Sequence, residues 1–182
     1  MDKRILKTKN NLTNTLLILI KEKNIYDITV LELCNKANIN RTTFYKYYKD
    51  IPDLLKNIEN TLLEELKENI NDIKRNYLIT FANKTIETIA KHKDIYSVIL
   101  GPNGDHTFLR QILNLVYEES IAEWQKLLRK ASIEDLEKIY NFIVDGTIGI
   151  ITSWLNNNCN ENPSNLTIFI NKICMSGLSS FI

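Results

Sequence analysis

The chain has 182 residues, of which 44% are hydrophobic and 25% are charged. This is the composition of one globular domain, alone or with a small appendage, and not of a disordered or collagen-like chain. Five glycines and three prolines are too few for the many turns of an all-β sandwich, and a formal net charge of +1 means that any surface for nucleic acid must be local.

Positive charge gathers near the start of the sequence. Residues 1–60 carry 11 lysines and arginines against 7 acidic residues, whereas residues 61–182 carry 12 against 15. Three widely spaced cysteines and two histidines fit neither a disulfide framework nor a zinc site. We find no signal peptide and no apolar run near the ~20 residues of a membrane span. We therefore expect a reduced, cytoplasmic protein without membrane contact, metal or other cofactor.

The first two predicted elements are helices. Leucines and isoleucines at positions 12, 16, 19 and 20 recur on one helix face and predict a helix over about residues 3–23. Thr29 and Glu32 have the spacing of a capping box, in which the hydroxyl accepts a hydrogen bond from the first turn of a helix. They precede a short amphipathic pattern, which predicts a second helix over about residues 30–36.

The next segment predicts a tight turn and a third helix that begins at Arg41. Asn38 tolerates the left-handed conformation that commonly ends a helix, and Asn40 is a good N-cap. Phe44 and Tyr48 are four residues apart and are expected to face the core. The opposite face carries cations, hydroxyls and phenols, which suit phosphate groups. A solvated charged face explains the same pattern and is the alternative.

Helical patterns continue to the end of the chain, so the predicted fold is all-α, with about nine helices. No segment alternates like a half-buried strand. The strongest turn signal is Gly101-Pro102-Asn103-Gly104-Asp105. The remaining predicted helices cover about residues 52–75, 78–92, 94–100, 105–131, 133–157 and 164–181.

The segment around the third helix carries a family signature. It reads I-T-V at residues 28–30, A-N-I-N at 37–40, T-F-Y-K-Y-Y-K-D at 43–50 and L-L at 54–55. This order resembles the DNA-binding helix-turn-helix of the TetR/AcrR family of bacterial transcriptional regulators. The resemblance covers about residues 5–58. It implies a DNA-binding domain over residues 1–50 and a helical regulatory and dimerisation domain over residues 51–182.

The resemblance assigns roles to the third helix. Arg41 and Thr42 lie near its N-terminal end and are expected to read base edges in the major groove. The tyrosines and lysines that follow are expected to fix the register on phosphates. Ile51 stands where the family usually has a lysine that touches a phosphate. This substitution calls one contact with the DNA backbone into question. The predicted DNA-binding residues are Asn40, Arg41, Thr42, Thr43, Tyr45, Lys46, Tyr47 and Lys49.

The resemblance also implies a homodimer joined by a four-helix bundle that the last two helices of each subunit form. The pattern over residues 133–157 agrees, because it has a second face that contains two glycines. A glycine inside a helix costs about 1 kcal/mol relative to alanine, which suggests the close approach of another backbone. The alternative is that both faces belong to the core of one subunit. The predicted dimer-interface residues are Phe142, Gly146, Gly149, Ser153, Ile170, Ile173 and Gly177.

A pocket for an unknown small-molecule effector is implied between the DNA-binding and dimer regions. Residues 100–109 are loosely similar to a subgroup that includes the activator of dihydroxyacetone-kinase operons. A stripe of large side chains over residues 105–131 is typical of a core as well as of an effector site. Asp145 stands in an apolar run, where contact with a ligand and simple solvation are both compatible with the pattern. The candidate pocket residues are Tyr117, Trp124 and Asp145.

The sequence has no G-x-S-x-G, P-loop or H-E-x-x-H motif, so we do not expect an enzyme. The predicted function is that of a DNA-binding transcriptional regulator. We expect a ligand-responsive repressor that binds a palindromic double-stranded operator as a homodimer. The alternative is a co-regulator with the same fold that acts through a protein partner instead of binding DNA directly.

Overall fold

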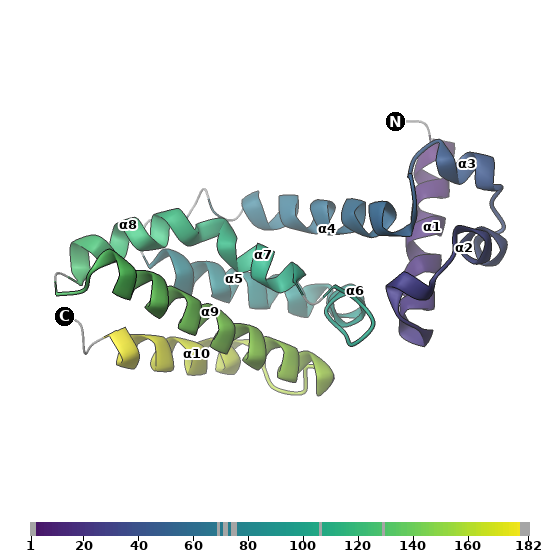
Figure 1. Ribbon diagram of the computed structural model, residues 1–182. Coiled ribbons are helices and arrows are strands. Elements are labelled where there is room, and N and C mark those ends of the chain that lie inside the picture. Colours follow the sequence, from purple (N-terminus) through teal and green to yellow (C-terminus); the bar gives the residue numbers. More distant parts are fainter. Residues whose placement is uncertain are drawn as a thin grey trace.

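The computed structural model describes residues 3–68, 70, 73, 76–105, 107–128 and 130–178, and every regular element within these ranges is helical. The all-α prediction is therefore confirmed. Figure 1 shows an elongated molecule with a small N-terminal group of helices at one end and a body of longer helices at the other. Helix α4 (Ile51–Glu68) runs between the two parts. Within the described ranges, no helix has both the length and the apolar character needed to cross a membrane.

The N-terminal group contains α1 (Lys3–Glu22), the short 3-10 helix η1 (Ile25–Asp27), α2 (Val30–Ala37) and α3 (Arg41–Tyr45). The bounds of α1 and α2 agree with the predicted ones to within a residue. α1 buries its predicted leucine and isoleucine face, and α2 packs against it. The Asn11 side-chain amide donates a hydrogen bond to the Ala37 carbonyl at 2.7 Å, and Lys23 pairs with Glu32 at 2.6 Å. These contacts fix α2 on α1, so that the turn after α2 starts from a defined position.

Helix α4 contacts α1 and η1 of the N-terminal group, and it contacts α5 (Tyr77–Lys91) and α7 (Phe108–Leu113) of the body. It ends at Glu68, so the predicted end near residue 75 is wrong. Three of the four residues in the sequence after Glu68 are Asn or Asp, which are residue types of low helix propensity. Ile73 is buried but lies outside any helix.

The body consists of α5 (Tyr77–Lys91), α6 (Lys93–Ile99), α7 (Phe108–Leu113), α8 (Tyr117–Leu127), α9 (Ile133–Asn156) and α10 (Pro163–Leu178). α9 begins with a complete capping box, in which the Ser132 hydroxyl and the Asp135 carboxylate each accept a hydrogen bond from the other residue's backbone N–H. α10 packs along α5 and, with α9, forms the outer layer of the body (Figure 1). The predicted end of the last helix, at residue 181, lies outside the described residues.

The predicted single helix over residues 105–131 is wrong, because η3 (Asn114–Val116), a short 3-10 helix, separates α7 from α8. The buried hydroxyl of Tyr140 donates a hydrogen bond to the Leu113 carbonyl at 2.9 Å. A contact from α9 therefore satisfies a carbonyl that the next turn of a continuous helix would otherwise use. This partner is 27 positions away in the sequence, so local periodicity gave no sign of the break.

The predicted turn at residues 101–105 is confirmed, and it also joins the two parts of the molecule. The Ile25 backbone N–H of η1 donates a hydrogen bond to the Asn103 carbonyl at 3.0 Å. A Cβ at Gly104 would overlap the Ile99 carbonyl oxygen, so the turn requires glycine at this position.

Candidate nucleic-acid interface

The turn between α2 and α3 is built by two asparagines. Asn38 adopts the predicted left-handed conformation, with φ 53° and ψ 48°, and the Ile39 N–H closes the end of α2 by donating to the Cys34 carbonyl at 2.9 Å. The Asn40 side-chain carbonyl accepts a hydrogen bond from the Thr42 N–H at 2.8 Å, as predicted for an N-cap. Both ends of the turn are therefore held by local hydrogen bonds, which set the direction of α3.

Helix α3 and the turn after it have one buried and one exposed side. Phe44 is fully buried and Tyr48 nearly so, and their rings pack 5.7 Å apart. The predicted DNA-binding residues divide by exposure. Thr43 and Tyr47 are half-buried, and the exposed ones are Asn40, Arg41, Thr42, Tyr45, Lys46 and Lys49. The buried pair thus anchors a short segment whose outer side presents cations, hydroxyls, a phenol and an amide to solvent.

A further cation, which the sequence analysis missed, lies beside this segment. The ammonium group of Lys9 on α1 is 5.6 Å from the centre of the Tyr47 ring and 5.9 Å from that of Tyr48. Contacts of this kind favour a cation over an aromatic face. Lys3 and Lys7 are exposed on the same helix. The density of cations in the first turns of α1 was a sequence signal for this, but only the fold brings Lys9 to the tyrosines.

Ile51 at the start of α4 is only 3% exposed. Its side chain belongs to the core and cannot reach a phosphate on the surface. Lys49 is exposed two positions earlier, and its backbone N–H donates to the Asp53 carboxylate at 2.9 Å. Lys49 is therefore the cation nearest in sequence to the start of α4.

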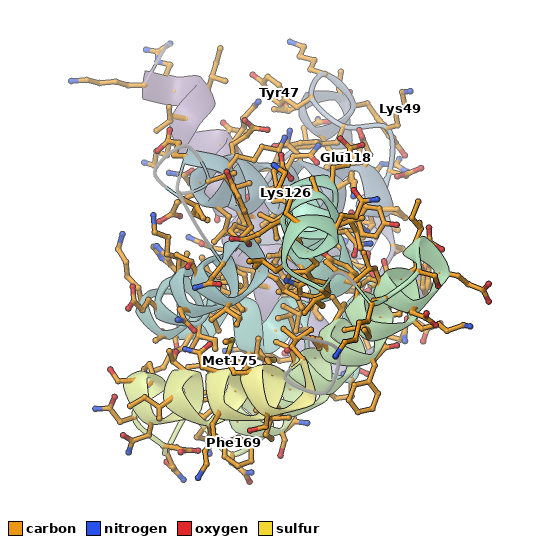
Figure 2. The ribbon with its side chains drawn as sticks, turned by 90° about the vertical axis from the view of Figure 1, so that its left-hand side faces the viewer. Tyr47, Lys49, Glu118, Lys126, Phe169 and Met175 are labelled. Atoms are coloured by element: carbon orange, nitrogen blue, oxygen red, sulfur yellow. The ribbon has the colours of Figure 1, made fainter. Side chains whose placement is uncertain are left out.

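The predicted dimer-interface residues lie on α9 and α10, and most of them form an exposed apolar face. Phe142 is 76% exposed and Ile173 is 47% exposed, whereas Gly146, Gly149, Ser153 and Gly177 are also open to solvent. Ile170 differs, because it is only 2% exposed and forms part of the floor of a groove between the two helices. That groove has a volume of about 540 Å³, and a second one of about 790 Å³ continues along α9 past Gly149. Figure 2 shows Phe169 and Met175 of α10 at the side of the molecule opposite Tyr47 and Lys49.

Side chains at the glycines of this face would have open space within the described part of the chain. A Cβ placed at Gly146, Gly149 or Gly177 would meet no atom within 4 Å. The alternative interpretation, in which both faces of this helix belong to the core of one subunit, is therefore wrong for the described part of the chain, because the second face is exposed.

The three candidate pocket residues do not share one environment. Tyr117 and Trp124 pack against the buried Tyr140, with ring centres 4.9 and 6.0 Å from it. Burial raises the pKa of the Tyr140 hydroxyl, which stays protonated and bonds to the α7 carbonyl. Asp145 is exposed on α9 and forms an ion pair with Arg110 of α7. The aromatic residues thus contribute to the core between α8 and α9, and Asp145 lies at its surface.

Comparisons with known proteins agree with this architecture. A family model of the TetR C-terminal region, described as "Transcriptional regulator C-terminal region", matches residues 78–176, which is more than half of the chain. The chain is 24% identical over 156 residues to the uncharacterized HTH-type transcriptional regulator YxbF of Bacillus subtilis (strain 168). That match covers 81% of this chain and 40% of the relative, so the chain spans about two fifths of the relative's length.

Solved structures share the fold over almost the whole chain. NalD of Pseudomonas aeruginosa, the secondary repressor of the MexAB-OprM multidrug efflux pump, superposes with a TM-score of 0.74 at 12% identity, over 95% of this chain and 97% of NalD. DhaS, a dihydroxyacetone kinase operon activator, superposes with a TM-score of 0.62 at 19% identity, over 96% of this chain and 97% of DhaS. At these identities the likeness concerns the fold alone.

Proposed function

Because the chain belongs to the TetR family of transcriptional regulators, we propose that it binds a palindromic operator in double-stranded DNA as a homodimer and represses transcription until an effector releases it. The observation that carries the proposal is the exposure of cations and hydroxyls on the α3 segment, which the buried Phe44 and Tyr48 anchor to the core. We assign residues 1–50 to the DNA-binding domain and residues 51–182 to the regulatory and dimerisation domain.

We assign base reading to the start of α3. Arg41 and Thr42 lie in its first turn, where residues approach base edges when such a helix enters the major groove. The Asn40 side chain already caps the helix, so no capping role is needed for the Thr42 hydroxyl. Tyr45, Lys46, Tyr47 and Lys49 follow and are assigned to the phosphates, with Lys9 as an additional cation.

The second part of the proposal is the homodimer. Exposed apolar residues and open glycines on α9 and α10 suit a partner helix that packs closely against the same face of a second subunit. A dimer of this kind presents two α3 helices, which must lie about 34–36 Å apart to enter successive major grooves. An effector then acts by favouring an arrangement in which this spacing is lost. We keep Tyr117, Trp124 and Asp145 as the candidate residues for the effector.

The proposal is tested by binding to the DNA upstream of the protein's own gene, measured by fluorescence anisotropy over a range of salt concentrations. Affinity is expected to fall steeply with salt, because bound lysines and arginines release counterions from the DNA. Lys46→Ala should weaken binding to all sequences alike and lower the log–log salt slope by about 1. Lys126→Ala on α8 is the matched control and should leave the slope unchanged, since this exposed lysine lies on the body.

If the protein binds no upstream fragment at low salt, direct DNA binding is contradicted. The buried Ile51, which replaces a family phosphate contact, would then favour the co-regulator that acts through a protein partner.

A further inference from the structure

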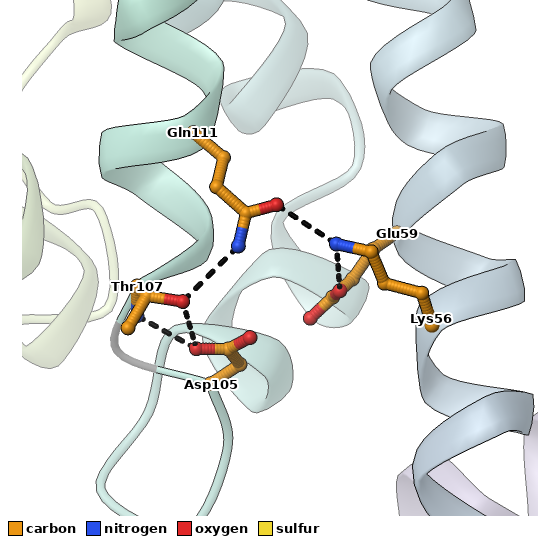
Figure 3. A network of polar contacts seen from close by, with 5 residues as sticks. All are labelled: Lys56, Glu59, Asp105, Thr107 and Gln111. Atoms are coloured by element: carbon orange, nitrogen blue, oxygen red, sulfur yellow. Dashed lines mark hydrogen bonds and ion pairs between the residues drawn. The ribbon is translucent and has the colours of Figure 1, made fainter.

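A buried carboxyl group lies on α4, in the joint between the DNA-binding part and the body. Glu59 is 1% exposed, and its Oε1 atom accepts no hydrogen bond from the described part of the chain. A carboxylate that is buried without enough donors is costly, so such a group is satisfied by a partner or holds a proton. Figure 3 shows Glu59 on α4 facing Asp105, which lies just before α7.

Hydrogen bonds connect the two sides of this joint. The Lys56 ammonium of α4 donates to the Gln111 side-chain carbonyl at 2.8 Å, and the Gln111 amide donates to the Thr107 hydroxyl at 3.1 Å. The Thr107 hydroxyl donates to the Asp105 carboxylate at 2.7 Å. This chain of polar contacts (Figure 3) ends on the carboxyl group that neighbours Glu59.

Lys56 only partly neutralises Glu59. Its ammonium group is 3.4 Å from Glu59 Oε2, which is longer than its bond to Gln111, and its side chain is about half exposed. Burial and the neighbouring Asp105 raise the pKa of Glu59 to about 7, whereas Lys56 opposes the shift. Among the described residues, the charged groups that act on Glu59 are thus Lys56 on α4 and Asp105 before α7, and the neutral Thr107 and Gln111 lie at the N-cap of α7 and within it.

We propose that protonated Glu59 and its neighbour Asp105 form a latch that holds α4 against the start of α7, so that loss of the proton from Glu59 loosens α4 and changes operator binding. With the proton present, the Glu59 hydroxyl donates a hydrogen bond to the Asp105 carboxylate. Without it, two negative charges face each other across the joint with one partly engaged lysine between them. α4 is directly connected to the α3 segment, so its displacement moves the proposed DNA-binding face. The effect on DNA rests on the proposed function, whereas the latch itself does not.

The first experiment needs no DNA. Carboxyl ¹³C shifts of the full-length protein report the protonation of Glu59 directly, and amide hydrogen exchange reports the protection of α4. We expect the Glu59 carboxyl to titrate near pH 7 and α4 protection factors to fall above that pH. Glu59→Gln keeps a hydrogen-bond donor at every pH and should hold α4 protection constant. A Glu59 carboxyl that titrates near its ordinary value of 4.5, or α4 protection that does not change with pH, overturns the latch.

Stability gives an independent readout with a defined sign. The folded protein keeps the proton up to about pH 7, whereas the unfolded chain releases it near 4.5, so the free energy of unfolding should decrease as pH rises between these values. Urea unfolding of wild type and Glu59→Gln at pH 5 and pH 8 measures this. The loss of stability from pH 5 to pH 8 should be smaller in the variant. Glu64→Gln is the matched control on α4, because its side chain is exposed, and it should follow wild type.

The second experiment measures operator affinity at pH 6 and pH 8. Coupling between sites commonly amounts to fivefold or more, and we expect a change of about that size in wild type and in Glu64→Gln but not in Glu59→Gln. His106 adjoins Asp105 in the sequence and lies outside the described residues, so His106→Gln is included. A pH effect that disappears in His106→Gln and persists in Glu59→Gln contradicts the latch. If no variant binds DNA at any pH, the proposed function fails and the DNA-free experiment still decides the latch.

Discussion

The α3 segment and the α9–α10 face are both exposed, but they expose opposite kinds of side chain. Around α3, the aromatic rings of Phe44 and Tyr48 are buried and the cations and hydroxyls point outward. On α9 and α10, Phe142 and Ile173 themselves are exposed, and the neighbouring glycines leave open space. A charged surface is stable in water with or without a ligand, whereas an apolar face of this kind usually marks an interface. The α9–α10 face is therefore the stronger indication that a partner binds. The α3 segment indicates instead which chemical groups its own ligand carries.

The largest effect is expected from placing a charge on the apolar face. Phe142→Glu should dissociate the proposed dimer, because loss of a hot-spot aromatic residue typically costs about 2 kcal/mol or more and a two-fold interface contains the change twice. The fold should survive, since this side chain is mostly exposed in the single chain. Sedimentation velocity measures the oligomeric state and circular dichroism the fold. Leu127→Glu is the control, because Leu127 is also exposed but lines neither groove. A Phe142→Glu protein that remains a stable dimer moves the interface elsewhere.

A glycine on the same face should give two effects of opposite sign. Gly149→Leu should stabilise the helix of the single subunit by up to about 1 kcal/mol, because glycine is a poor helix former and the site has room. The same change should weaken the dimer by about 1–3 kcal/mol, because it forces the two helices apart. Unfolding at low concentration and sedimentation equilibrium separate these effects.

Gly104→Ala provides the contrast, since its Cβ would overlap a carbonyl of the same chain and should destabilise the subunit itself. Equal dimer affinity in wild type and Gly149→Leu would show that no backbone approaches this glycine.

The smallest effects are expected within the α3 segment, where they separate specificity from affinity. Thr42→Ala should relax preference at one or two symmetric operator positions by about 1 kcal/mol each, the lower end of the range for a base contact. Tyr45→Phe should weaken good and poor sites about equally, because it removes a hydroxyl assigned to the phosphates. Selection of binding sites from a random DNA pool compares the two variants with wild type. Identical selected motifs for wild type and Thr42→Ala would contradict the assignment of Thr42 to a base edge.

The same contrast explains what could be predicted from the sequence. Caps and turns depend on neighbouring residues, so the roles of Asn38 and Asn40 and the burial of Phe44 followed from local patterns. Features that depend on residues distant in the sequence could not be predicted in this way. The break before α8 lies where the Tyr140 hydroxyl of α9 donates a hydrogen bond to the Leu113 carbonyl, and Lys9 of α1 lies over the Tyr47 ring. Both contacts join residues far apart in the sequence.

The joint around Glu59 was invisible for the same reason. Glu59 lies four residues after Leu55 and three before Leu62, so the helical pattern of α4 places it on the buried face, but nothing nearby in the sequence identifies the group that it meets there. Its neighbour Asp105 lies in a turn that is more than forty positions later in the sequence. Similarly, the periodicity of α10 placed Ile170 on the apolar side, but only the packing of α9 and α5 shows that it lies at the floor of the groove.

The most direct test of the central claim is a hydroxyl-radical footprint of the wild-type protein on the DNA upstream of its gene. The two-fold dimer built through α9 and α10, with an α3 segment on each subunit, predicts two symmetric protected stretches. Their centres should lie about 10–10.5 base pairs apart, or a multiple of that spacing, on a palindromic sequence. Phe142→Glu should abolish the paired pattern. A single asymmetric stretch, or a paired pattern that Phe142→Glu leaves intact, would contradict the claim that these two faces act together.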